Sequence, residues 1–127
     1  MPEIKVTLSG PFLTGQPAVV VDNTMRRTIA ELVAMGEIDV SEQLYPGHGL
    51  VTGHYRRSIH GEVLNSRNGT VHDSKVIYGP WLEGVTSRNQ RTRFKGYAAF
   101  RNAFQRLERK AQGILNKHVG RAMKDLN

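Results

Sequence analysis

Hydrophobic periodicity in the first third of the chain predicts one strand followed by helices. At the start, Ile4, Val6 and Leu8 alternate with polar neighbours, which indicates a half-buried strand. From residue 20 onward apolar residues recur at three- and four-residue steps, so we expect a helix with one buried face. The residues of that face are Val21, Met25, Ile29, Leu32 and Val33. Because glycine lowers helix propensity, Gly36 is expected to end this helix before a second short helix at residues 38–44.

The middle of the chain has the signals of a short helical turn and a β-hairpin. Thr52 is a suitable N-cap for a turn that contains Tyr55, and a strand is expected to follow it. Asn68-Gly69 is the preferred sequence for a type I′ hairpin turn, after which the chain is expected to return antiparallel. Alternation is irregular along this return, so we expect a bulge near Asp73.

The last part of the chain combines an aromatic turn, a basic segment and a long amphipathic helix. Gly79-Pro80 turns the chain sharply into Trp81. Residues 86–95 are polar and basic without periodicity, which is typical of a mobile loop. Residues 97–124 have an apolar stripe at helical spacing and predict one long helix. The stripe consists of Phe100, Phe104, Leu107, Ala111, Ile114, Leu115 and Met123.

These elements predict an α+β fold. A small antiparallel β-sheet is expected to pack against an N-terminal helical region and a long C-terminal helix. At 127 residues, the whole chain 1–127 is expected to form a single domain with one modest core. The absence of cysteine excludes disulfides and thiolate metal ligands. The N-terminus lacks the pattern of a secretory signal and no apolar run reaches membrane-spanning length, so no membrane contact is expected.

The charge of the chain is strongly asymmetric. The formal net charge is +7, but residues 1–85 carry a net −2 and residues 86–127 a net +9. The basic excess begins in the 86–95 loop, whose cations are Arg88, Arg91, Arg93 and Lys95. Such a segment suits a negative surface, either DNA or an acidic protein face, although it also matches an ordinary solvated surface. Contact with DNA would be non-specific, because no helix-turn-helix, zinc-finger or RNP-like pattern is present.

Metal and catalytic chemistry are not favoured by the sequence. Four of the five histidines, His48, His54, His60 and His72, fall close together, yet none has the helical spacing of a zinc site. Ser58 lies near two of these histidines, but there is no nucleophile elbow and no phosphate-binding glycine loop. We therefore expect no metal site and no catalytic site.

Two short segments carry a resemblance to a known family. The first reads Thr52-Gly53-His54-Tyr55-Arg56-Arg57-Ser58-Ile59 and the second reads Tyr78-Gly79-Pro80-Trp81-Leu82-Glu83-Gly84. In this order, with a hairpin between them, they resemble the neck or tail-completion proteins of long-tailed bacteriophages. That family has Thr-Gly-x-aromatic/Leu-Arg-x-Ser-Ile before the hairpin and Tyr-x-x-aromatic-x-Glu-x-Gly after it. The chain departs from the pattern in its N-terminal strand, in Gly79-Pro80, and in the lack of a proline before Phe94.

The resemblance implies a mechanical role in the virion. It implies the same α+β architecture and a homo-oligomeric ring, commonly a hexamer, at the head–tail joint, assembled in the host bacterial cytoplasm. The ring would join the head connector or stopper to the tail terminator and leave a channel for DNA, with no enzymatic activity and no cofactor. Subunit or partner contacts are expected at Arg56, Arg57, Tyr78, Trp81 and Glu83. The lumen, the DNA or a partner ring is expected to meet Arg88, Arg91, Arg93 and Lys95.

Several alternatives remain open. Arg56 could pair with Glu83 inside one subunit instead of across an interface, and Trp81 could pack beneath the C-terminal helix. At the level of function, a tail terminator ring has a similar size and composition. A small basic protein that binds nucleic acid non-specifically is the alternative from a different class.

Overall fold

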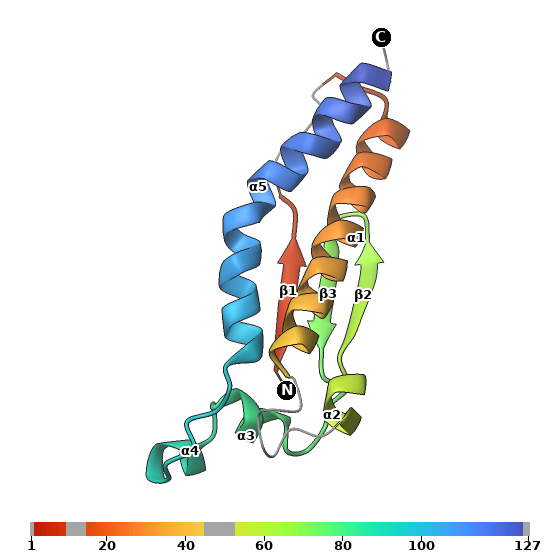
Figure 1. Ribbon diagram of the computed structural model, residues 1–127. Helices are drawn as coiled ribbons and strands as arrows, with labels where there is room; N and C mark the ends of the chain where they lie inside the picture. The colour runs from red at the N-terminus through yellow and green to blue at the C-terminus, as the bar shows by residue number, and fades with distance from the viewer. Residues whose placement is uncertain (1, 10–14, 45–52, 126–127) are drawn as a thin grey trace.

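The computed structural model describes residues 2–9, 15–44 and 53–125, and it confirms the α+β fold. A three-stranded antiparallel sheet has the order β1-β3-β2, with β1 at Glu3–Thr7, β2 at His60–Asn65 and β3 at Asn68–His72. Two long helices, α1 (Ala18–Gln43) and α5 (Ala99–Asp125), cover one face of the sheet (Figure 1). Three short helices, α2 (Gly53–Arg57), α3 (Gly79–Glu83) and α4 (Ser87–Arg91), gather at one end of the molecule.

Helix α1 runs through Gly36 without a break, so the prediction of two helices is wrong. Gly36 is buried where α1 meets both the sheet and α5. A Cβ at this position would lie 3.0 Å from Leu107 Cδ1 and 3.1 Å from Val71 Cγ2. The glycine therefore serves close packing of three elements, and the core contacts on either side offset its low helix propensity.

Two further glycines let α1 lie close to the strands. A Cβ at Gly61 would lie 2.5 Å from Val33 Cγ1, and one at Gly69 would lie 2.5 Å from Val33 Cγ2. The amide of Gly61 also donates to Glu37 Oε2 at 2.7 Å. Glycine in a strand interior often marks such a close approach. The sheet and α1 are thus joined by packing and by a direct hydrogen bond.

The hairpin turns two residues earlier than the sequence predicted. The turn lies at residues 66–67, and Asn68 pairs with Asn65, so Asn68-Gly69 belongs to β3. The side chain of Asn65 fixes this turn by accepting from the amide of Arg67 at 2.9 Å and from Asn68 Nδ2 at 3.0 Å. The register irregularity lies between Val63 and Asn65 in β2, not near Asp73.

The core lies between the sheet and the two long helices. As predicted, Ile4 of β1, Ile29 of α1 and Leu107 of α5 are buried in it. Polar contacts join α1 and α5 along their length: Arg106 Nε donates to Asp39 Oδ2 at 2.6 Å. In the parts of the chain that the structure describes, no helix is both long and apolar enough to cross a membrane.

Candidate partner interface

The predicted basic loop forms a compact projection, which we call the knob (residues 85–95). Its two ends meet at Gly84 and Gly96, which have φ values of +94° and +91°. A Cβ at Gly96 would lie only 2.3 Å from Gly84 Cα, so side chains are excluded from this junction. Tyr97 N–H donates to the Leu82 carbonyl at 2.6 Å and fastens the base. Figure 1 shows α4, inside the knob, projecting beyond the sheet and the long helices.

One buried side chain, Asn89, organises the knob. Its Nδ2 donates to the carbonyls of Trp81 and Phe94 at 3.0 and 3.1 Å. Its Oδ1 accepts from the amide and the hydroxyl of Thr86 at 3.1 and 2.6 Å. Thr86 in turn accepts from the Asn89 amide, which completes a capping box at the start of α4. The prediction that this segment lacks regular structure is wrong, and Thr86 three residues before Asn89 was the missed signal.

An aromatic stack joins the knob to the body. The Trp81 ring lies 4.9 Å from Phe94, and Phe94 lies 5.0 Å from Tyr97 in an edge arrangement. The guanidinium of Arg88 lies 5.1 Å from the centre of the Trp81 ring, a cation–π geometry. Trp81 is half-buried and packs against the core as well as against Phe94. It therefore joins the body of the protein to two residues of the knob, Phe94 and Arg88.

The four predicted cations of the knob have different surroundings. Arg91 and Arg93 are exposed, and within the described residues neither makes a hydrogen bond or an ion pair. Arg88 is held over Trp81. Lys95 Nζ donates to the carbonyls of Asn89 and Gln90 at 3.0 and 3.2 Å, at the C-terminal end of α4. A cation suits that helix end, so Lys95 stabilises the knob while the arginines face solvent.

Glu83 has a structural position that the sequence did not indicate. Its carboxylate is 7% exposed and accepts from the amides of Phe100 and Arg101 at 2.9 and 3.0 Å. Both bonds satisfy free amides at the start of α5. Burial raises the pKa of Glu83, and the two amide hydrogen bonds oppose that rise. Arg56 forms no ion pair with Glu83 in the described residues, so the predicted pairing within one subunit is wrong.

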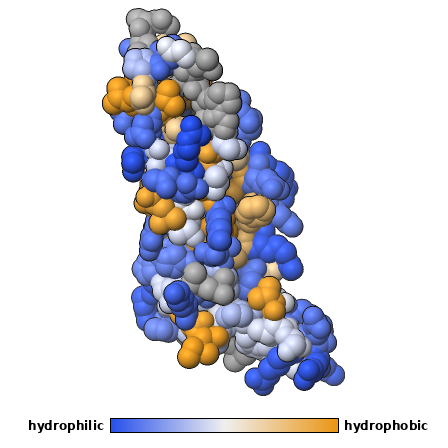
Figure 2. Space-filling view, turned by 180° about the vertical axis from the view of Figure 1, so that it is seen from behind, coloured by the Kyte–Doolittle hydropathy of each residue, from blue (hydrophilic) through white to orange (hydrophobic). Residues whose placement is uncertain are grey.

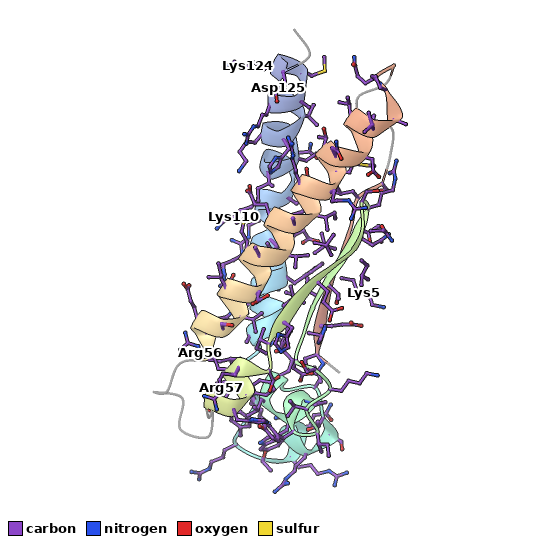
Figure 3. The ribbon with its side chains drawn as sticks, turned by 90° about the vertical axis from the view of Figure 1, so that its right-hand side faces the viewer. Lys5, Arg56, Arg57, Lys110, Lys124 and Asp125 are labelled. Carbon is purple, nitrogen blue, oxygen red and sulfur yellow. The ribbon has the colours of Figure 1, made fainter. Side chains whose placement is uncertain are left out.

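The predicted arginines of α2 lie apart from Glu83. Arg56 and Arg57 are exposed, and Figure 3 shows both on the side of the molecule that carries the long helices. Because Glu83 is buried with both oxygens bonded, a neighbouring subunit could reach it only by displacing the start of α5. The two arginines are therefore available to another acidic surface.

The two segments that carry the resemblance meet at a buried joint. The hydroxyl of Tyr55 donates to Asp73 Oδ2 at 3.0 Å, and the other carboxylate oxygen accepts from the Lys75 amide at 3.1 Å. A Cβ at Gly79 would lie 1.8 Å from Asp73 Oδ2, so only glycine fits there. Burial, followed by the nearby charge of Asp73, raises the pKa of Tyr55. The first segment thus packs directly against the start of the second.

Exposed apolar side chains surround this joint. Ile77 is 96% exposed, Val85 66% and Tyr78 41%, while one face of Tyr78 packs on Tyr55 with ring centres 5.6 Å apart. A groove of about 560 Å³ runs from β1 to α5 past Pro80 and Val85. Figure 2 shows small hydrophobic patches beside the knob on a mostly hydrophilic surface. This end of the molecule therefore combines apolar side chains with free arginines.

The described histidines have neighbours other than a cluster of metal ligands. His72 Nε2 lies 3.0 Å from Glu62 Oε1, and the His60 and His72 rings are 6.3 Å apart. No three potential ligands gather among the described residues. His48 and the predicted cap Thr52 lie outside the described residues.

No protein-family model, curated protein or solved structure matches the chain.

Proposed function

We propose that this chain is a structural protein of the phage neck. It would form a homo-oligomeric ring that joins the head connector to the tail and surrounds the DNA channel. The observation that carries the proposal is the convergence of the two resembling segments at the Tyr55–Asp73–Gly79 joint. Two short motifs that pack against each other form one structural unit. A match to one structural unit supports a resemblance more strongly than matches to two motifs that lie apart.

The surface next to the joint supports a role in protein contact. Interfaces are enriched in aromatic residues and arginine, with apolar side chains at their centre. Ile77, Tyr78 and Val85 supply exposed apolar surface, and Arg91 and Arg93 supply charges without partners among the described residues. Free arginines beside an apolar patch favour recognition of an acidic partner, because charges set orientation and specificity more than affinity.

The interface is tested by reversing charge in the knob. The double variant Arg91→Glu, Arg93→Glu is expected to abolish head–tail joining, or ring formation by the purified protein in native mass spectrometry. The matched control is Arg26→Glu, Arg27→Glu, which makes the same charge change on exposed positions of α1. Equal behaviour of the two variants would refute the knob as an interface.

The role in the particle is tested by electron microscopy after deletion of the gene. Filled heads beside finished, unattached tails are the expected result. Abnormally long tails would instead support the tail terminator alternative. Intact virions would refute the neck proposal and leave non-specific nucleic-acid binding as the leading function.

A further inference from the structure

Helix α5 carries a second group of cations, separate from the knob. Two of its basic residues are used inside the fold, since Arg106 pairs with Asp39 and Lys117 donates to Glu31 at 2.6 and 2.8 Å. Five others are exposed and, among the described residues, take part in no ion pair: Arg101 at the start of the helix, and four residues further along it. These four form what we call the α5 cation face: Arg109, Lys110, Arg121 and Lys124.

The four cations lie on one side of the helix. At about 100° per residue they fall within an arc of about 120°, and the rise of 1.5 Å per residue spreads them over about 22 Å. Glu108 lies on roughly the opposite side of the helix by the same spacing. Figure 3 shows Lys110 and Lys124 on the helical side of the molecule, with Lys5 on the sheet side.

Acidic groups near this face are few. Glu42 of α1 and Lys110 both line a shallow groove of about 350 Å³ between the helices. Asp125 follows Lys124 at the end of α5. Asp39 and Glu31 are already paired with Arg106 and Lys117, so they do not neutralise the four exposed cations.

The residues between the cations favour a polyanion over a protein as the partner. Between Lys110 and Arg121 the exposed residues are polar or glycine: Gln112, Gly113, Asn116, Lys117 and Gly120. Between Arg121 and Lys124 one apolar residue, Met123, is 39% exposed. A stable protein interface needs an apolar centre, which this stretch lacks and the knob end has. Duplex DNA needs none, because its affinity for proteins comes mainly from phosphate neutralisation. A length of about 22 Å matches about six base-pair steps of a duplex.

We propose that the α5 cation face binds the backbone of duplex DNA without sequence specificity. The inference rests on the proposed function for where the DNA lies, since a head–tail ring encloses a channel, while the binding itself is a property of the helix. It assigns DNA contact to α5 and leaves the knob for a protein partner.

The test compares two triple variants that lose the same charge. One is Lys110→Gln, Arg121→Gln, Lys124→Gln on α5, and the control is Arg88→Gln, Arg91→Gln, Arg93→Gln on the knob. Binding of two unrelated 30-base-pair duplexes is followed by fluorescence anisotropy between about 50 and 200 mM KCl. Circular dichroism checks folding, and native mass spectrometry records the oligomeric state of each variant.

The wild type is expected to bind both duplexes equally, with a slope of log K against log salt near −3.6 for about four phosphate contacts. For the α5 variant, which loses three cations, the slope should be smaller in magnitude by about 2.7. This variant should also bind DNA at least about tenfold more weakly at 100 mM salt. The knob variant should retain the wild-type slope.

Three results would overturn the inference. An equal loss of DNA affinity in both variants would show that binding depends only on net charge. A loss of DNA affinity in the knob variant alone would place the DNA-binding surface on the knob. Failure to bind duplex at 50 mM salt, with binding of poly-L-glutamate, would indicate an acidic protein partner. DNA binding through α5 by a protein that never forms a ring would refute the proposed function and leave this inference standing.

Discussion

The same substitution, glycine to alanine inside a long helix, should stabilise the protein at one position and fail to stabilise it at another. Alanine at Gly113 of α5 meets nothing within 4 Å. The expected result is a gain of about 1 kcal/mol in the free energy of unfolding, which is the difference in helix propensity. For a chain of this size the gain corresponds to an increase of about 4 °C in Tm.

At Gly36 the propensity gain is opposed by overpacking. The new methyl group would lie 3.0 Å from Leu107 Cδ1 and 3.1 Å from Val71 Cγ2, both tighter than ordinary carbon contacts. Overpacking of a core by one methyl group costs about 1–3 kcal/mol. After the propensity gain of about 1 kcal/mol is subtracted, Gly36→Ala should be neutral to about 2 kcal/mol less stable.

Urea unfolding followed by circular dichroism at 222 nm measures both variants at one protein concentration. The two free energies should differ by about 1–3 kcal/mol with unchanged m-values. Because the chemistry is identical, the difference reports only the surroundings of the two positions. If Gly36→Ala were as stabilising as Gly113→Ala, the close approach of α1, α5 and β3 would be refuted.

Three further substitutions test hydrogen bonds at the Tyr55–Asp73–Gly79 joint, in the knob and at the start of α5. Tyr55→Phe leaves Asp73 without its hydroxyl donor and should cost about 1–3 kcal/mol in urea unfolding, whereas Tyr78→Phe, at an exposed position, should cost less than about 0.5 kcal/mol. Asn89→Ala removes the side-chain bonds that hold the knob, so trypsin should cut its arginines several times faster, and an unchanged digestion rate would contradict the assignment. Burial raises the pKa of Glu83 above its ordinary value of 4.5, so the folded state favours the protonated carboxyl group. The stability that the protonated form gives the folded state is lost as the pH rises through the raised pKa. The stability advantage of wild type over Glu83→Gln in urea unfolding should therefore shrink as the pH rises above 4.5, and an advantage that grew with pH would refute the direction of the shift.

The sequence predicted the elements that periodicity controls. Alternation identified β1 through Ile4, and helical spacing identified most of the buried faces of α1 and α5, including Ile29 and Leu107. Two predicted members of the α5 face, Phe104 and Met123, are exposed. These patterns can be read from the sequence because the hydrophobic effect favours burial of apolar side chains at any position in the chain. The residues predicted for subunit, partner or DNA contact lie in or beside α2, α3 and α4, which gather at one end of the molecule.

The sequence could not decide what individual glycines and polar side chains do. Gly36 and Gly69 are read locally as a helix end and a hairpin turn, but each is needed where α1 approaches another element. Glu83 reads as an exposed interface charge because its partners, the amides at the start of α5, follow a long intervening segment. Only tertiary structure brings such partners together, so the errors fall on residues whose role is set by distant neighbours.

The chain enters and leaves the knob at adjacent positions, so the knob is an insert in the fold. Gly84 and Gly96 touch, and the Tyr97–Leu82 hydrogen bond lies on the body side of the junction. A short linker could therefore replace residues 85–95 without altering the path of the remaining chain. The same fold could therefore carry an insert of different sequence at this position, while the scaffold that bears it stays the same.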